Sequence, residues 1–273
     1  MTSPTLLDYL KQLETRGVTH VGIDDRARSV LRELYTRGSA RRPAKQAAVP
    51  ADAPPPPIPN RIEATGKTAA EKIASLAAIA ENWPAARSLG SLRDTMVFSV
   101  GNPEADFMLV GEAPGFQEEQ KREPFVGPAG AKLDQILKAM GLSRETVYIS
   151  NVCKFRPATK NQTINNRKPS TEEMATSIPF VQAEIDVVKP KVIVALGGSA
   201  AQGLLGSDKP IGQLRDSWHQ FQGIPLRVTF HPSYLLRQDE DHGEKRKVWE
   251  DMLAIMAKLG LPISTKQRGY FQK

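Results

Sequence analysis

Cysteine is almost absent from this sequence of 273 residues, and Cys153 is its one representative. A single cysteine excludes a disulfide within the chain. It also excludes a four-thiolate iron–sulfur or zinc site built from one copy of the chain. We therefore expect no cofactor and no metal site, and we expect Cys153 to be an inert residue near the end of a strand.

Long apolar runs are also missing. No segment of the sequence approaches the roughly 20 apolar residues that a membrane-spanning helix needs. The first ten residues, MTSPTLLDYL, have no basic lead and carry Asp8 inside their short apolar run, unlike a secretory signal peptide. These absences predict a soluble protein of a reducing compartment, the bacterial cytoplasm or nucleoid, with no membrane partner.

Charge of one sign is in excess. The formal net charge is +7 and the isoelectric point is about 9.5, while the apolar fraction of 40% is ordinary for a globular protein. A basic balance of this size favours an anionic partner such as nucleic acid, although it says nothing about the fold.

The chain is predicted to have three parts. Residues 1–40 form a small helical N-terminal module, with amphipathic helices expected over 5–16 and 24–37. Residues 41–60 are rich in proline and alanine and include four consecutive prolines, which is typical of an extended linker. Residues 61–273 form the main domain. Neither the role nor the partner of the N-terminal module can be inferred from its sequence.

The main domain alternates short apolar runs with helical patterns. Strands are expected at 107–110, 147–151, 192–196 and 226–230, and mostly β-branched runs of this length are typical of strands buried on both faces. Helical stripes lie between and after them, one ending at Gly141, one beginning with a Ser170–Glu173 capping box, and one over 248–259. The pattern predicts an α/β fold, a three-layer α/β/α sandwich around a central, mostly parallel four-stranded sheet.

Unusual residues stand at or near the ends of these strands, where parallel sheets bind ligands. They are GEAPGFQEE at 111–119 with PFVGPAG at 124–130, Asn151, LGGSAAQGLLG at 196–206, and HPSYLLR at 231–237. Each one alone has a plain structural interpretation: a tight turn, a core phenylalanine at 125, a cap or turn asparagine at 151, and core leucines at 235 and 236.

Together, the order and spacing of these motifs resemble the uracil-DNA glycosylase superfamily, and most of all its family 4 branch, whose members carry an iron–sulfur cluster. The resemblance covers roughly residues 80–260. It implies that Glu112 orients the attacking water and that His231 hydrogen-bonds the departing uracil. Phe125 would stack on the extruded base, and Asn151 would distinguish uracil from cytosine. Glu118 would line the pocket where the methyl group of thymine would fall.

Further residues are assigned by their place around these motifs. Gly111 and Ala113 belong to the turn that would face uracil. In the family, a wedge from the His-Pro loop fills the gap left by the flipped base, which points to Leu235 and Leu236. The positions expected to contact DNA are Lys154, Arg156, Ser199, Leu235, Leu236 and Arg237. Residues 154–168 contain five Lys or Arg and no acid, which favours a phosphate-contacting loop over a merely solvated one.

The sequence departs from the family at every cluster ligand. The four positions hold Trp83, Ala86, Phe155 and either Ser177 or, in another alignment, Thr176. Because two large aromatic residues stand among them, we predict that Trp83 and Phe155 pack into the former cluster volume. Residues 158–165 are a second departure, an insertion. A related branch has a histidine in a comparable insertion that bonds covalently to the sugar, but this one has none.

Three functions remain open at this point. The first is a monofunctional glycosylase that removes uracil from DNA and leaves an abasic site. The second is a DNA-binding homologue without catalysis, and the third is a glycosylase for another deaminated base such as hypoxanthine. The sequence does not indicate a preference for single- or double-stranded DNA. A monomer is expected because the family acts as monomers.

Overall fold

The computed structural model describes residue 26 and residues 61–237 and 242–271. The chain divides into two units, Met1–Ala53 and Pro54–Lys273. The predicted helices at 5–16 and 24–37 and the linker at 41–60 lie outside the described residues, Arg26 excepted.

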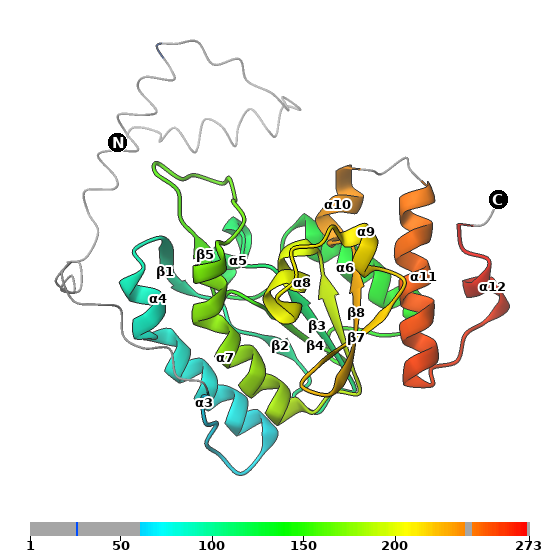
Figure 1. Cartoon of the computed structure of the whole chain (residues 1–273), viewed down its shortest axis with the longest axis horizontal. Coiled ribbons are helices and arrows are strands. Elements are labelled where there is room, and N and C mark those ends of the chain that lie inside the picture. Colours follow the sequence, from blue (N-terminus) through cyan, green and yellow to red (C-terminus); the bar gives the residue numbers. More distant parts are fainter. Residues whose placement is uncertain (1–25, 27–60, 238–241, 272–273) are drawn as a thin grey trace, which may run out of the picture. The chain divides into compact units, whose positions relative to one another are not determined.

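A six-stranded sheet forms the centre of this unit, in the order β2-β4-β3-β6-β8-β7 (Figure 1). Neighbouring strands are parallel from β4 through β3 and β6 to β8, while β2 and β7 are antiparallel edges. The bounds are β2 Val100–Gly101, β3 Phe107–Gly111, β4 Tyr148–Asn151, β6 Val192–Leu196, β7 Trp218–Phe221 and β8 Ile224–Thr229.

The four strands predicted from the sequence are therefore the parallel centre of the sheet, and the mostly parallel α/β/α architecture is confirmed. The predicted number of four strands is wrong, because two edge strands were missed. β2 has only two residues, and β7 alternates exposed and half-buried positions, so neither contains a buried apolar run. A separate two-stranded ribbon pairs β1 (Leu92–Met96) with β5 (Phe155–Pro157).

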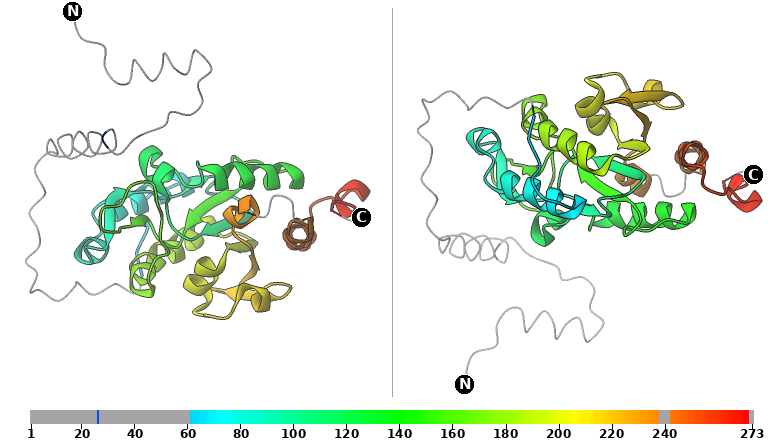
Figure 2. Two further views of the ribbon diagram at one scale, coloured as in Figure 1. Left: turned by 90° about the horizontal axis from the view of Figure 1, so that it is seen from above. Right: turned by 90° about the horizontal axis from the view of Figure 1, so that it is seen from below.

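Side chains of the central strands alternate between two cores. Met108 and Val110 of β3 face the core that contains residues of α7 and α8, and Phe107 and Leu109 face the core that contains residues of α6 and α11. Such period-two alternation places both faces of a buried strand in apolar surroundings. Figure 2 shows α6 on the opposite side of the sheet from α7 and α8. Two helical layers thus enclose the sheet.

Two helices begin or end at a signal expected from the sequence. Ser170 caps α7 by accepting from the Glu173 amide at 3.1 Å, and Gly141 ends α6 at a φ of 79°. The helices are α3 Ala69–Glu81, α4 Pro84–Ser88, α5 Phe116–Lys121, α6 Pro128–Met140, α7 Thr171–Val188, α8 Gly198–Leu205, α9 Ile211–Leu214, α10 Pro232–Arg237, α11 His242–Leu259 and α12 Thr265–Arg268. Within the described ranges, no helix is long and apolar enough to cross a membrane.

A third core lies where α3, α4 and the β1–β5 ribbon meet α7, and it contains both aromatic residues at the cluster-ligand positions. Trp83 is 8% exposed and Phe155 is 1% exposed. The Trp83 ring meets Phe180 edge-on at 4.9 Å, and its Nε1 donates to the Thr176 carbonyl at 2.8 Å. Arg87 lies over the Phe155 ring. The predicted burial of Trp83 and Phe155 in one core is confirmed.

The remaining positions that hold cluster ligands in the family are also buried. Ala86, Thr176 and Ser177 are buried, and the Ser177 hydroxyl accepts from the Lys154 amide at 3.3 Å. These positions therefore carry no thiolate, and packed side chains and hydrogen bonds take up the space. This residue set does not fit an iron–sulfur cluster. Across residues 61–237 and 242–271, no three His, Cys, Asp or Glu side chains gather as a metal site requires.

Candidate active site

A pocket of about 670 Å³ lies at the edge of the sheet where the parallel strands end. Its walls come from the segments that follow β3, β4, β6 and β8, together with residues 166–169 and 207–211. Seven of the residues expected at the site line this pocket: Glu112, Ala113, Glu118, Phe125, Asn151, Ser199 and His231. Residues separated by up to 119 positions in sequence thus meet because four parallel strands end at the same edge.

Gly111 lies beneath the pocket rather than in its lining. A Cβ atom at this position would approach the Asn151 Oδ1 atom to 2.3 Å and the Phe125 ring to 2.5 Å. These distances are far below van der Waals contact, so only glycine allows the amide and the ring to converge at this point. Asn151 is 2% exposed at the end of β4, and Phe125 is 5% exposed.

Phe125 has a backbone φ of 56°, which costs a non-glycine residue roughly 1–2 kcal/mol. Two residues hold it there. The Arg144 guanidinium donates to the Phe125 carbonyl and, at 3.1 Å, to the Pro124 carbonyl. Gly130 lies so close to the Phe125 carbonyl that a Cβ would overlap it. The ring position is therefore set by the backbone around it, and Arg144 is a residue that the motifs did not point to.

Glu118 uses its carboxylate to shape the same loop. It accepts from the backbone amides of Gly115, Val126 and Gly127 at 3.1, 3.0 and 2.8 Å. Three such bonds join the turn after β3 to the loop that carries Phe125. Glu118 lines the pocket, as expected, but the geometry gives it a positioning role as well.

His231 follows β8, and its ring stacks on Phe125 with centroids 5.6 Å apart and planes inclined by 27°. Its Nδ1 contacts both the hydroxyl and the backbone amide of Ser233, at 2.8 and 3.2 Å. A backbone amide can only donate, so Nδ1 is the acceptor in that bond. A neutral His231 then carries its proton on Nε2. The turn at the start of α10 thereby selects the imidazole tautomer.

Comparison with known proteins decides the family. A profile described as "Uracil DNA glycosylase superfamily" matches residues 98–253, more than half of the chain. This chain belongs to the uracil-DNA glycosylase superfamily. It is 40% identical over 164 residues to the "Type-4 uracil-DNA glycosylase" of Thermotoga maritima, covering 59% of this chain and 81% of that protein.

Two archaeal proteins with the same name are similar as well. The type-4 enzyme of Pyrobaculum aerophilum is 34% identical over 167 residues, covering 58% of this chain and 82% of its own. That of Archaeoglobus fulgidus is 44% identical over 114 residues, covering 42% and 54%. The chain is thus a superfamily member similar to type-4 enzymes, with a single cysteine.

The basic segment of this superfamily member differs from expectation. Lys154 and Arg156, both predicted to contact DNA, are 0% and 2% exposed. Lys154 Nζ lies 2.6 Å from Glu184 of α7, and burial lowers the pKa of Lys154 although Glu184 opposes that shift. Arg156 lies 2.8 Å from Glu119 of α5. The assignment of both residues to the DNA surface is wrong, because acidic partners from distant helices hold them inside the domain.

Arg167 is paired too. Its two terminal nitrogens meet the Glu173 carboxylate at 2.7 and 2.5 Å, which joins the end of the inserted loop to the first turn of α7. Burial opposes ionisation of Glu173, but hydrogen bonds from Arg167, Ser91 and Ser170 outweigh it and lower the pKa of Glu173. Lys160 and Lys168 of this segment are exposed, and Lys168 lines the pocket.

The expected wedge of Leu235 and Leu236 is confirmed as exposed at only one of the two positions. Leu235 is 3% exposed and belongs to the core between the sheet and α6 and α11, so it is not a surface wedge in this conformation. Leu236 is 38% exposed. Arg237 is the last residue of α10, and its side chain lies outside what the structure describes. On the six-residue α10, one leucine faces the core and the next faces outward.

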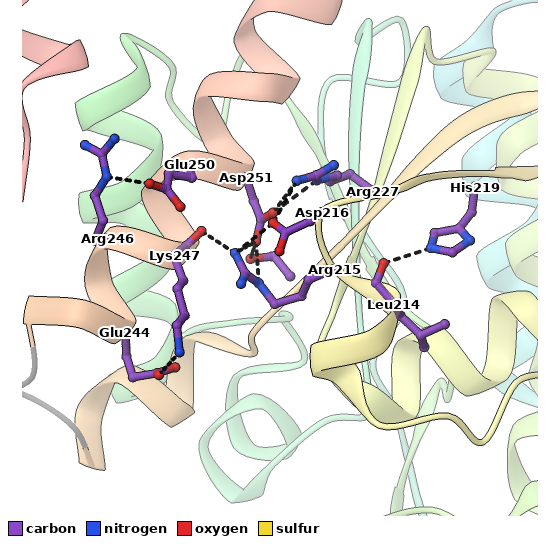
Figure 3. Close-up of polar contacts among 11 residues, drawn as sticks. Leu214, Arg215, Asp216, His219, Arg227, Glu244, Arg246, Lys247, Glu250 and Asp251 are labelled. Atoms are coloured by element: carbon purple, nitrogen blue, oxygen red, sulfur yellow. Dashed lines mark hydrogen bonds and ion pairs between the residues drawn. The ribbon is translucent and has the colours of Figure 1, made fainter.

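A buried ionic cluster joins Asp251 to Arg215 and Arg227 (Figure 3). Asp251 of α11 is 0% exposed and accepts from Arg215, Arg227 and Thr229 at 3.0, 2.8 and 2.7 Å. Burial raises the pKa of the Asp251 carboxyl, although these three donors act in the opposite direction. Thr229 ends β8 two residues before His231, so the cluster joins α11 to the strand that carries His231.

The cluster also reaches the pocket wall. Arg215 lies 5.1 Å from the centre of the Phe230 ring, and Phe230 stacks on Tyr234 at 4.8 Å. Both aromatic residues line the pocket. Neither they nor the polar turn at 207–210 were anticipated. A Ser-Asp-Lys-Pro turn directly after α8, at the same sheet edge, was the sequence signal for the latter.

Proposed function

We propose that this protein hydrolyses the N-glycosidic bond of deoxyuridine in DNA, releasing uracil and leaving an abasic site. One observation carries the proposal: a single pocket brings together a carboxylate, an aromatic ring, an amide and an imidazole, namely Glu112, Phe125, Asn151 and His231. These are the groups needed to hold an extruded base and to stabilise the charges that develop when its bond to the sugar breaks.

Base recognition falls to Phe125 and Asn151. The flipped uracil stacks on the Phe125 ring, and the Asn151 carbonyl accepts from N3–H while its amide group donates to O4. Cytosine presents the opposite pattern, and it would leave buried polar atoms of Asn151 unpaired. Gly111 lets the two side chains converge, and Ala113 and Glu118 line the pocket around the base.

Bond cleavage falls to Glu112 and His231. As the bond breaks, the sugar gains positive charge and the uracil gains negative charge. Glu112 orients the attacking water and faces the cationic sugar. A neutral His231 with its proton on Nε2 donates a hydrogen bond to uracil O2, and the Ser233 amide keeps it in that tautomer. No covalent enzyme intermediate is needed. Ser199, Leu236 and Arg237 contact the DNA beside the extruded base.

The direct test uses oligonucleotides that carry one uracil, one hypoxanthine or no lesion, incubated with the full-length protein and then treated with alkali. Strand scission at uracil alone is the expected result. Scission at hypoxanthine instead of uracil would show that hypoxanthine is the substrate. DNA that is shifted on a gel but remains uncut would show that the protein binds DNA without catalysis.

Arg144 provides a test of how the stacking ring is positioned. Arg144→Ala removes the donors that hold the Phe125 carbonyl, and we expect kcat/KM for uracil release to fall about tenfold. Arg144→Lys should restore little, because one ammonium cannot serve the Pro124 and Phe125 carbonyls together in the same geometry. The measurement is single-turnover kinetics on a uracil oligonucleotide. Lys138→Ala, an exposed position on neighbouring α6, is the control. Equal rates for the Arg144 variants and wild type would contradict this role.

A further inference from the structure

Ile164 lies in the inserted loop and is 71% exposed. The other exposed large apolar side chains among the described residues are only 38–42% exposed: Ile79, Trp218, Leu236 and Phe271. Burial of such a side chain in an apolar setting is favourable, so Ile164 would gain free energy by inserting into an apolar partner. Its neighbours Thr163 and Asn165 are polar, so it is a single apolar point and not part of a broad patch.

The structure holds this point in place. Arg156 Nη2 donates to the carbonyls of Thr163 and Asn165, at 2.9 and 2.8 Å, which are the residues on either side of Ile164. Its Nε donates to the Asn166 side chain at 3.0 Å, and its Nη1 is held by the buried Glu119. The buried Arg156 guanidinium thus hydrogen-bonds the backbone on both sides of Ile164. These hydrogen bonds restrict the backbone around Ile164, which reduces the conformational entropy that binding would cost.

The loop is placed to meet the DNA that enters the pocket. Asn166, two residues after Ile164, lines the pocket, so the two Cα atoms are at most about 7 Å apart along the chain. Figure 1 shows the loop between β5 and α7 rising on the same side of the sheet as α10. Residues 158–168 contain no acid, and Lys160 and Lys168 are exposed on either side of Ile164. In this arrangement the two lysines could contact DNA phosphates while the isoleucine between them enters the adjacent base step.

We propose that Ile164 inserts into the DNA base stack beside the extruded nucleotide and acts as a wedge supplied by the insertion. The proposal rests on the proposed function, because it takes uracil-containing DNA as the partner. Ile164 would also take the place of Leu235, which was expected to act as a wedge but lies in the core. An inserted apolar side chain replaces stacking that a duplex loses, whereas a single strand has little stacking to replace.

The test compares duplex and single-stranded oligonucleotides of the same sequence, with uracil next to the fluorescent base 2-aminopurine. For Ile164→Ser we expect kcat/KM on the duplex to fall about tenfold, the loss that corresponds to one unburied aliphatic side chain. On the single strand the change should stay below about twofold. The rise in 2-aminopurine fluorescence on duplex binding should be lost in this variant and kept in Ile164→Leu.

Lys160→Ala is the matched control on the same loop. It should weaken duplex and single-strand binding alike and reduce the salt dependence of both. Thermal melting of each variant shows that the fold is retained. Equal losses on both substrates for Ile164→Ser, wild-type values on both, or an Ile164→Leu variant that behaves like Ile164→Ser would overturn the wedge.

The two proposals fail separately. If wild-type protein excises no uracil from either substrate, the proposed function fails, and the wedge is then decided by fluorescence on the uncut duplex. A fluorescence rise with wild type that Ile164→Ser lacks supports insertion without catalysis. An equal fluorescence rise with wild type and Ile164→Ser would overturn the proposed wedge.

Discussion

Replacing Glu112 by Gln is expected to lower kcat for uracil release by about 10²–10⁴-fold, the range that one positioned acid–base group contributes. The amide keeps the shape of the side chain but loses the negative charge that, in the proposed mechanism, faces the sugar, and the basic oxygen that would orient the water. Glu118 cannot substitute, because its carboxylate accepts from three backbone amides of the loop. Binding of uracil DNA should change little, so the loss appears in kcat and not in KM.

Asp208→Asn is the matched control for this charge change. Asp208 also lines the pocket, but it lies on the exposed turn after α8 and not at the end of a central strand. We expect its kcat to stay within about threefold of wild type, as for surface changes away from the chemistry. Single-turnover rates at saturating enzyme give both values. A Glu112→Gln enzyme that keeps more than a tenth of the wild-type rate would remove Glu112 from the mechanism.

The parallel centre of the sheet was predictable from local sequence, and the seven pocket residues were predictable from the strand ends together with the family resemblance. Each parallel strand is an apolar run, and the residues after it, such as Glu112, Asn151 and His231, must meet at one edge. Leu235 could not be assigned to the core in this way. The two leucines of α10 are adjacent, and only the packing of α6 and α11 decides which one is buried.

The basic segment 154–168 shows that sequence alone does not reveal which charged side chains are paired. Residues 154–168 read as a uniformly cationic stretch, yet three of its five cations pair with carboxylates from other elements. Glu119, Glu184 and Glu173 belong to helices whose sequence positions do not reveal the contact. The bonds from Arg156 to the loop are equally hidden, although they are what presents Ile164. The sequence therefore predicts an anionic partner, and the structure shows which cations of the segment are paired within the domain.

Asp251→Ala is expected to lower the free energy of unfolding by about 3–5 kcal/mol, the cost of removing one partner from a buried ionic group. Arg215 and Arg227 are each 6% exposed, and both would keep their charge without the carboxylate that they share. The nearby Asp216 offers little compensation, because its side chain is 68% exposed and its contacts are longer, at 3.4 and 3.6 Å. Urea unfolding followed by tryptophan fluorescence measures the change.

Glu250→Ala, on the same helix and one residue earlier, is the control that separates charge from position. Glu250 pairs with Arg246 at 2.7 Å, but its side chain is 47% exposed (Figure 3). Solvent screens such a pair, so its loss should cost about 0.5 kcal/mol or less. If Asp251→Ala costs no more than Glu250→Ala, the cluster contributes no stability to this domain.

The same cluster has a consequence for His231 that stability alone does not measure. Thr229 donates to Asp251 and leads directly into the His231 turn, while Arg215 packs on Phe230 between them. In Asp251→Asn the shape is kept but the charge is lost, so folded protein should remain at low temperature with the loop less firmly held. We expect kcat to fall with little change in KM, since the proposed role of His231 is to stabilise the departing base rather than to bind the substrate. A variant with wild-type kcat would restrict Asp251 to stability.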